Sequence, residues 1–333
     1  MKRTLGTLLP AACVLLGAFP PLGIAASQRS FVASDGVDAN PCSLTQPCRS
    51  FSAALAQTNA GGEIVVVDSA GYGPVTINKA VSIVAPPGVY AGVSVLGGDG
   101  IVVNAGPSED VVLRGLTVNA QGGNNGIVFN SGSALYVENC TVRGFNGPSS
   151  ANIRFAPSTA SRLSVKDSFI RGGTTGVLVT NAATASAVTI DNARIEGNTI
   201  GLSAGTFSGA LTLRNAVFVD NLGHAISLQT GAGQALDATV DNVMVSNNVG
   251  NGIDARGAAI TVAMSNSTIV RNATGVYVQG GATAATARLT GNLVARNATG
   301  IQTAANGAIL TPLSNTIEGN VVDGTTSGSY AQK

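Results

Sequence analysis

The feature that most constrains the fold of this 333-residue chain is a repeated sequence pattern. In one copy, Asn192 is followed three residues later by Ile195, then by a turn containing Gly and Asn, and then by the apolar pair Gly201-Leu202. The first position of the pattern is held in turn by Gly115, Asn139, Asp167, Asn192, Asn215, Asn242, Asn266, Gly291 and Ser314. The spacing is (314 − 115)/8, about 25 residues, which is typical of solenoid repeats.

Each copy holds three short β-rich runs, which in one copy are 188–190, 193–195 and 201–204. Runs this short, interrupted by Gly and Asn, do not support amphipathic helices. Their backbone groups can be paired only with the same run of the next copy, parallel and about 4.8 Å away. The repeat therefore predicts three parallel sheets wound around a narrow core.

The Asn at the first position predicts a sharp corner between two runs. Asn tolerates left-handed backbone conformation, and its side chain can bond to neighbouring amides. Stacked at successive corners, these side chains would form a hydrogen-bonded ladder. We expect Asn215 and Asn242 to lie buried in this ladder, so that Asn215→Leu would destabilise the fold substantially by leaving neighbouring amides unpaired.

With its Asn corner, its Gly-apolar strand and its repeat length, the sequence resembles the right-handed parallel β-helix proteins of pectin-lyase-like type. This group includes pectate lyases, polygalacturonases and alginate-modifying epimerases. The resemblance covers residues from about 61 to 320. The prediction is an all-β, right-handed, single-stranded parallel β-helix of three sheets and about 10–11 coils, spanning residues 61–322. These features specify the fold and say little about activity.

The first residues predict export. The chain starts with a basic segment, Met1-Lys2-Arg3, an apolar stretch extends from Leu5 to about Ile24, and small residues follow at 25–27. This pattern indicates a signal peptide over residues 1–26. No later stretch is long and apolar enough to span a bilayer. We expect a secreted, periplasmic or cell-surface protein with no stable membrane span once the signal is removed.

Residues 27–60 depart from the repeat and predict an N-terminal cap. Cys42 and Cys48 both follow proline, which in an exported chain indicates a loop closed by a disulfide. Ser50 can cap a short helix over the residues up to Gln57, with its apolar side chains on one face. Such a helix would cover the open end of the core.

At the other end, residues 323–333 are rich in Gly, Ser and Thr and are expected to form a flexible tail. What covers the last coil stays open, and so does the oligomeric state. Within the repeats, Cys140 alternates toward the core and is expected to be a small buried residue rather than a reactive thiol.

Charge and composition exclude some functions. Without Lys2 and Arg3, 18 − 2 = 16 basic side chains face 17 acidic ones, so we expect no nucleic-acid partner. Zinc would need more Cys or His near the cysteine pair, and the spacing of Asp35 and Asp38 lacks the Glu of a calcium loop. We predict no metal and no cofactor, with calcium considered only if the protein is a lyase.

Ligand binding is expected along one outer sheet and its bordering turns. Outward alternation places Arg154 and Tyr277 on that sheet, while Arg143 and Arg171 lie in the turns after the corner strands. Arg143, Arg154 and Arg171 from adjacent coils could hold carboxylate or sulfate groups bidentately. A plain solvated surface explains the same positions, because a soluble solenoid must place its few charges outside.

Four residues are weak candidates for catalysis: Asp220, His224, Asp254 and Arg256. His224 is the only histidine and could be a general base. The enzyme motifs of the resembled group are incomplete: Asn-Thr-Asp is reduced to Asn-Thr-Ile at 198–200, and Gly-His-Gly to Gly-His-Ala at 223–225. The Asp-Pro-His-Asp motif of the epimerases is absent.

Two functions therefore stay open. The first is an exported, non-enzymatic β-helix that binds acidic polysaccharide or serves as a surface or structural module. The alternative is a polysaccharide lyase or hydrolase acting on acidic polysaccharide, as the resemblance implies. A compact cluster of acidic groups and Arg inside a groove would favour the enzyme.

Overall fold

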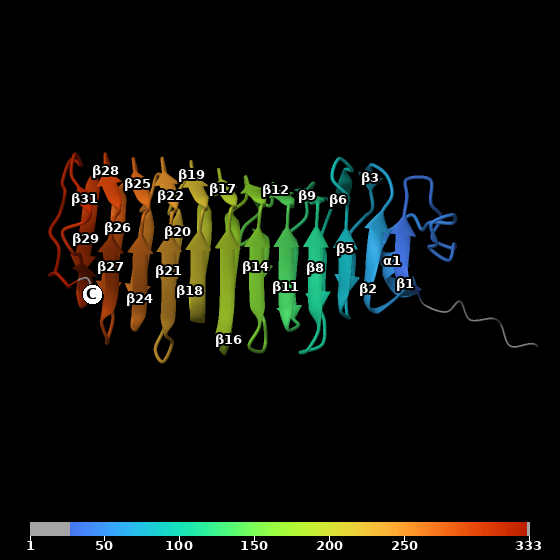
Figure 1. The fold of residues 1–333 in the computed structure, drawn as a ribbon, viewed down its shortest axis with the longest axis horizontal. Helices are drawn as coiled ribbons and strands as arrows, with labels where there is room; N and C mark the ends of the chain where they lie inside the picture. Colours follow the sequence, from blue (N-terminus) through green and yellow to red (C-terminus); the bar gives the residue numbers. More distant parts are fainter. Residues whose placement is uncertain (1–26, 332–333) are drawn as a thin grey trace, which may run out of the picture.

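The computed structural model describes residues 27–331, except for the side chains of residues 181–184. The expected signal peptide, 1–26, lies outside this part of the chain. The coils stack along one long axis, from β1 and α1 at one end to β29 and β31 at the other (Figure 1). The expected all-β parallel β-helix with one short helix is confirmed, because every pairing between its strands is parallel.

Three ladders of strands run the length of the solenoid. The first contains β1 (Ser27–Val32), β2 (Thr58–Val66), β5 (Val81–Val84), β8 (Asp110–Arg114), β11 (Ala134–Glu138), β14 (Arg162–Lys166), β16 (Thr175–Asp191), β18 (Ile200–Arg214), β21 (Leu236–Asp241), β24 (Ile260–Ser265), β27 (Ala285–Thr290) and β30 (Gly307–Leu310). The second contains β4 (Val75–Ile77), β7 (Asp99–Asn104), β10 (Asn125–Ser131), β13 (Ala151–Phe155), β16, β18, β20 (Ile226–Gln229), β23 (Ile253–Gly257), β26 (Thr274–Gly280) and β29 (Thr299–Ala304).

The third ladder consists of short strands. They are β3 (Ala70–Gly71), β6 (Ala91–Val95), β9 (Leu116–Ala120), β12 (Thr141–Arg143), β15 (Phe169–Arg171), β17 (Arg194–Glu196), β19 (Val217–Val219), β22 (Met244–Ser246), β25 (Thr268–Val270), β28 (Leu293–Ala295) and β31 (Thr316–Ile317). Because β16 and β18 run through both of the other ladders, those two join into one 20-stranded sheet in the described chain, beside this 11-stranded one.

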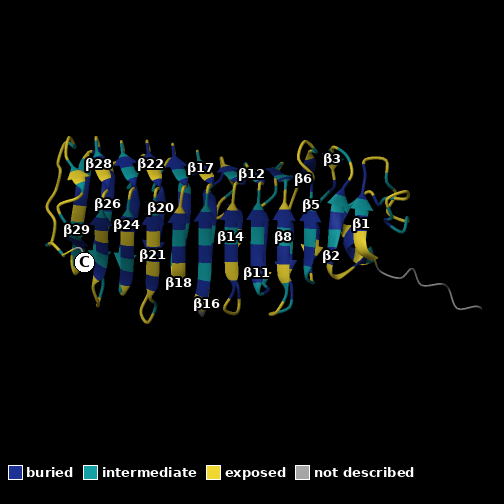
Figure 2. Cartoon of the chain, viewed as in Figure 1, coloured by how far each residue is buried: buried dark blue, intermediate teal, exposed yellow. Residues whose placement is uncertain are grey.

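The core is a column of inward side chains stacked in register. Val142, Ile170 and Ile195 pair across β12, β15 and β17, and all three are fully buried. Buried and exposed residues alternate along the strands, and exposed residues gather in the turns (Figure 2). Hydrophobic burial in this column, added coil by coil, is what holds the repeats together.

The corners have the expected backbone but not the expected burial. Asn192, Asn215 and Asn242 have left-handed φ values of 49°, 53° and 52°. The Asn242 Nδ2 donates to Asn215 Oδ1 at 2.8 Å, so a ladder exists. These side chains are exposed, however, and the prediction that they are buried is wrong. At the corner it is the next residue, such as Ala216 or Val243, that turns into the core.

A second, buried ladder of asparagines lies six residues further on, in the turn that follows the third-ladder strand. Its fully or almost fully buried members are Asn198, Asn221, Asn248, Asn272 and Asn297. Asn152, which lies on β13 instead, extends the row because its Nδ2 donates to Asn198 Oδ1 at 2.9 Å. Most of these amides donate to the next Asn in the row, as from Asn221 to Asn248 at 2.8 Å and from Asn248 to Asn272 at 2.8 Å. Sequence analysis missed this row, although the spacing of Asn192 to Asn198 and Asn242 to Asn248 recurs.

The N-terminal end is closed as expected by a disulfide loop and a helix. Ser50 caps the start of α1 (Phe51–Gln57), because its side chain accepts a hydrogen bond from the Ala53 amide. The apolar face of α1 is buried. Cys42 and Cys48 form a disulfide. The loop between them covers the outer edge of β1, where the Phe31 amide donates to the Cys42 carbonyl at 2.8 Å and the Cys48 amide donates back at 2.9 Å.

At the other end, the last residues run along the final coil. The Gly300 amide donates to the Val322 carbonyl at 2.7 Å, and the Thr311 amide to the Gly328 carbonyl at 3.2 Å. The Tyr330 hydroxyl donates to the Leu289 carbonyl at 3.2 Å. These bonds cover edges of β29 and β30; the flexibility expected of residues 323–333 stays a prediction. No helix among residues 27–331 is long and apolar enough to cross a membrane.

Candidate functional site

A row of polar side chains follows the outer face of the third ladder. Ser94, Asn119, Arg143, Arg171 and Glu196 pair in register from β6 to β17. Each stands next to a buried apolar residue, so alternation along the strand directs each away from the core. Asn119, which bonds to Tyr90 and Arg143, is nevertheless only 9% exposed. Parallel stacking therefore brings side chains about 25 residues apart in sequence to a separation of about 4.8 Å per coil.

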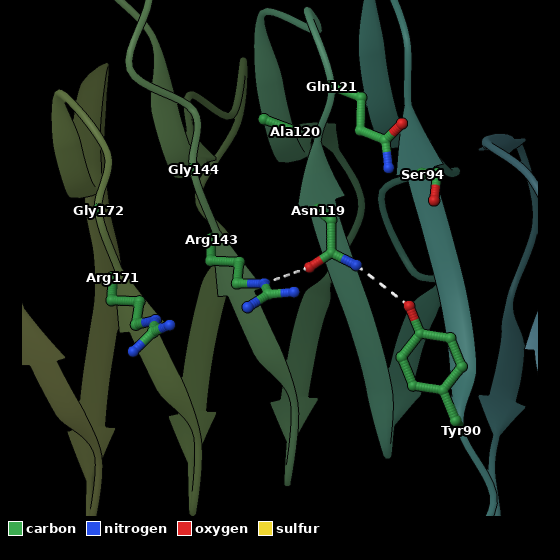
Figure 3. A pocket seen from close by; sticks show the side chains of 9 residues that line it. All are labelled: Tyr90, Ser94, Asn119, Ala120, Gln121, Arg143, Gly144, Arg171 and Gly172. Atoms are coloured by element: carbon green, nitrogen blue, oxygen red, sulfur yellow. Dashed lines mark hydrogen bonds between the residues drawn. The ribbon is translucent and has the colours of Figure 1, made fainter.

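A groove of about 470 Å³ follows this row. Its lining residues are Tyr90, Ser94, Asn119, Ala120, Gln121, Arg143, Gly144, Arg171 and Gly172 (Figure 3). Gly144 and Gly172, with φ values of 85° and 64°, come directly after the two arginines. Their left-handed conformation turns the chain sharply at that point and suits a residue without a Cβ.

Arg143 is held in place by neutral partners. Its Nε donates to Asn119 Oδ1 at 2.6 Å, and Asn119 Nδ2 donates to the Tyr90 hydroxyl at 3.2 Å (Figure 3). Arg143 makes no ion pair with any carboxylate between residues 27 and 331. Its positive charge is therefore fixed in position and uncompensated by a direct partner.

Arg171 is held more loosely. Its guanidinium lies 5.4 Å from the centre of the Phe169 ring, and its Nη1 is 3.9 Å from Glu196 Oε1. Its side chain remains 46% exposed, so the contact with Glu196 is a weak surface ion pair. Two stacked guanidinium groups, one fixed and one adjustable, can each take a carboxylate or sulfate bidentately.

The groove continues past Arg171 with the opposite charge. The second part, of about 360 Å³, is lined by Arg171, Gly172, Glu196, Gly197 and Asp220. Glu196 accepts a hydrogen bond from Arg194. Asp220 follows β19 and is exposed. This candidate catalytic residue thus belongs to the acidic end of the groove.

Arg154 does not line this groove. It lies on β13 of the second ladder, in register between Val128 and Leu178, and is exposed. Sequence alternation correctly turned Arg154 outward but did not show that β12 and β13 belong to different sheets. The structure therefore brings Arg143 and Arg171 together and leaves Arg154 apart.

Two other candidate catalytic residues, Asp254 and Arg256, meet on β23 in a separate cluster. Arg256 Nε donates to Asp254 Oδ2 at 2.7 Å and its Nη2 to Oδ1 at 3.0 Å. The guanidinium lies 4.6 Å from the centre of the Tyr277 ring, which places this predicted ligand-binding residue here rather than in the groove. The hydrogen bonds that Arg256 donates to Asp254 raise the pKa of Arg256 above its usual value.

His224 joins this cluster only indirectly. Its Nδ1 accepts a hydrogen bond from the Asn251 amide at 3.0 Å, and the Asn251 side chain donates to Asp254. Asp254 is 0% exposed, and each of its oxygens already accepts a hydrogen bond. These hydrogen bonds hold Asn251, in the turn before β23, against the sheet. The Asp254 carboxylate is covered and is not accessible to a substrate.

Residues 27–331 hold no group of three His, Cys, Asp or Glu side chains placed to bind a metal ion. Glu196 and Asp220 share their part of the groove with Arg171, a poor set of ligands for calcium. The free thiol, Cys140, is buried as expected, and burial raises its pKa to about 12. Its protonated state at neutral pH fits a packing role.

These ladders and stacked turns define a right-handed parallel β-helix repeat protein with a pectate lyase-like fold. Residues 99–259 match the family model described as "Right handed beta helix region". No curated protein matches the sequence.

Solved structures share the fold at low identity. Pectate lyase Pel9A is 15% identical, with a TM-score of 0.53 over 92% of this chain and 80% of its own. The Dettilon tailspike protein is 10% identical, with a TM-score of 0.59 over 90% of this chain and 68% of its own. The A-module of mannuronan C-5 epimerase AlgE4 from Azotobacter vinelandii is 13% identical, with a TM-score of 0.58 over 82% of this chain and 91% of its own. At these identities the likeness shows the fold alone.

Proposed function

We propose that this protein binds acidic polysaccharide in the groove along β9, β12 and β15, as a non-enzymatic module. The observation that carries the proposal is the in-register stacking of Arg143 and Arg171 inside one groove. Tyr90 and Asn119 add neutral hydrogen-bonding groups that suit sugar hydroxyls. The names of two similar structures, a pectate lyase and a mannuronan epimerase, support the ligand class.

The chemistry of the groove favours binding over cleavage. Its arginine-bearing part is lined by Arg, Asn, Gln, Ser and Tyr side chains, with no carboxylate to act as general acid or base. The alternative of a lyase or hydrolase loses one of its candidates, Asp254, because Arg256 and Asn251 cover its carboxylate. It keeps Asp220, which lies beside Arg171 and Glu196 at the acidic end. Accordingly, purified protein incubated with uronate polymers should generate no unsaturated products.

We further propose that binding takes place outside the cytoplasm. Two features support this placement: the basic and apolar pattern of residues 1–26, and the Cys42–Cys48 disulfide, a bond that persists in oxidising compartments. Detecting the bonded peptide by mass spectrometry in exported protein, and the free thiols in cytoplasmic protein, tests it.

The groove is tested with the double variant Arg143→Ala/Arg171→Ala. Isothermal titration with a defined uronic acid oligomer should show affinity falling about tenfold or more, because two charge-assisted contacts are lost. Binding by the unmodified protein should weaken as salt rises, because the arginines are partly exposed.

Arg154→Ala is the matched control. It removes an exposed arginine of the same length from a different sheet, and should leave the affinity unchanged. Equal losses in the control and the double variant would point to non-specific charge attraction. Undetectable binding by the unmodified protein at low salt would reject the proposed function.

A further inference from the structure

The groove changes charge along its length. In the register row, the neutral Ser94 and Asn119 are followed by Arg143 and Arg171, and then by Glu196. The next two register positions, Val219 and Ser246, carry no charge. The positive part therefore extends over two coils, and the two arginines in it are one coil step, roughly 4.8 Å, apart.

The basic and acidic parts of the groove adjoin each other at Arg171. Arg171 and Gly172 line both the larger part and the smaller part that contains Glu196 and Asp220. A polymer lying along the row past Arg171 must consequently pass both carboxylates. Asp220 makes no ion pair within residues 27–331, so its negative charge faces the groove without a direct partner.

From this order of charges we infer that the groove selects a short anionic segment, about two acidic groups long, flanked by uncharged sugar. This inference rests on the proposed function and narrows its ligand class. Arg143 and Arg171 each take one anionic group. Asp220, which has no ion-pair partner among the described residues, repels a third one on the far side, because like charges placed together act against the wrong ligand. Glu196 adds to this repulsion, and its ion pairs with Arg194 and Arg171 offset part of its charge. The preferred ligand is a polysaccharide with widely spaced acidic groups, or an acidic chain end, rather than a uniform polyuronate.

The experiment compares a dimer and a much longer oligomer of the same uronic acid, on the unmodified protein and on Glu196→Gln/Asp220→Asn. Removing both carboxylates should tighten binding of the long oligomer by about tenfold, and that of the dimer clearly less. The measured quantity is the gain in affinity of the long oligomer divided by the gain in affinity of the dimer. A long oligomer has more ways to bind than a dimer, and this statistical advantage cancels because it is the same for the unmodified protein and for the variant. The ratio also cancels the gain in affinity that both ligands share when Arg171 loses its contact with Glu196.

Asp110→Asn/Asp237→Asn is the matched control for net charge. Both aspartates are exposed, and they lie on β8 and β21 of the first ladder, away from the groove. This variant should improve binding of the two ligands equally or not at all.

The outcomes separate the two claims. If the oligomer and the dimer gain equally from the groove substitutions, the charge-order inference is overturned while acidic-glycan binding stands. The same holds if the control variant reproduces the selective gain. If the unmodified protein binds neither ligand, both the proposed function and the inference fall.

Discussion

At the scale of single residues, the buried asparagines show how a polar group is accommodated in a narrow apolar solenoid. The Asn248 side chain is buried, and its Nδ2 contacts the Phe218 carbonyl, the Ser246 carbonyl and Asn272 Oδ1 at 2.8–3.2 Å. Its Oδ1 accepts from both the backbone amide and the side chain of Asn221. The amide satisfies turn backbone in its own coil and in neighbouring coils, so its loss leaves buried groups unpaired.

We expect Asn248→Ala to lower the free energy of unfolding by about 2–3 kcal/mol, because partners in three coils lose a buried hydrogen bond. Urea unfolding measures the difference. The contrasting variant is Asn242→Gly at the exposed corner, where glycine keeps the left-handed φ of 52°; its cost should be below about 1 kcal/mol. An equal loss of unfolding free energy in the two variants would show that the buried ladder contributes no more to stability than the exposed one.

At the scale of elements, the N-terminal cap joins three segments around two aspartates. Asp38 accepts hydrogen bonds from the Arg49 and Ser50 amides, both at 2.8 Å, and so positions the start of α1. Asp68 accepts hydrogen bonds from Ser34 and from Tyr72, linking the segment after β1 to the first coil. The loop closed by Cys42 and Cys48 then covers the edge of β1. Each segment depends on the others for its place.

Replacing both cysteines by serine should cost about 2 kcal/mol of stability, because the closed loop is short. The amide of Phe31, which bonds to the Cys42 carbonyl, should also exchange hydrogen faster than amides of the central coils. Reducing the unmodified protein with dithiothreitol should reproduce both effects. Unchanged exchange at Phe31 in the variant would mean that the loop holds its place without the disulfide.

At the scale of the whole molecule, carboxylates along the solenoid tie coils together and make the fold sensitive to acid. Hydrogen bonds from Ser34 and Tyr72 lower the pKa of Asp68. Those from Ser265 and Asn266 lower the pKa of Asp241. At Asp191 the raising effect of burial is outweighed by hydrogen bonds from Asn215 and Arg214, so its pKa is lowered too.

A carboxyl whose pKa is lower in the folded state contributes stability above its unfolded pKa of about 3.9, and this stability is lost as the pH falls through the folded pKa. We therefore expect the unfolding temperature to be constant near neutral pH and to drop below about pH 4. Asp241→Asn should flatten part of that drop when melting is followed by circular dichroism. An unfolding temperature that rises on acidification would contradict the sign of these shifts.

The repeat predicted the parallel ladders and the left-handed corners, because each depends on local chemistry that recurs every coil. The capping helix was predicted separately, from Ser50 and the apolar spacing of the residues that follow it. The repeat did not show which asparagine row is buried: Asn215 lies in the corner before β19 and Asn221 in the turn after it, and packing decides which of these side chains faces the core. Likewise, Arg143 and Arg154 both point outward by alternation. Only the corner between β12 and β13, which bends through residues 144–150, determines that they face different directions.

The two ends of the solenoid are covered by different segments, and these coverings affect whether copies of the protein can associate end to end. A parallel solenoid has a free edge at each end, and the edge at one end could accept the opposite end of another copy. Such head-to-tail contacts build open fibres rather than closed rings. Here the Cys42–Cys48 loop occupies the edge of β1, while Val322 and Gly328 occupy edges of β29 and β30. Polymerisation through these edges would first have to displace both coverings.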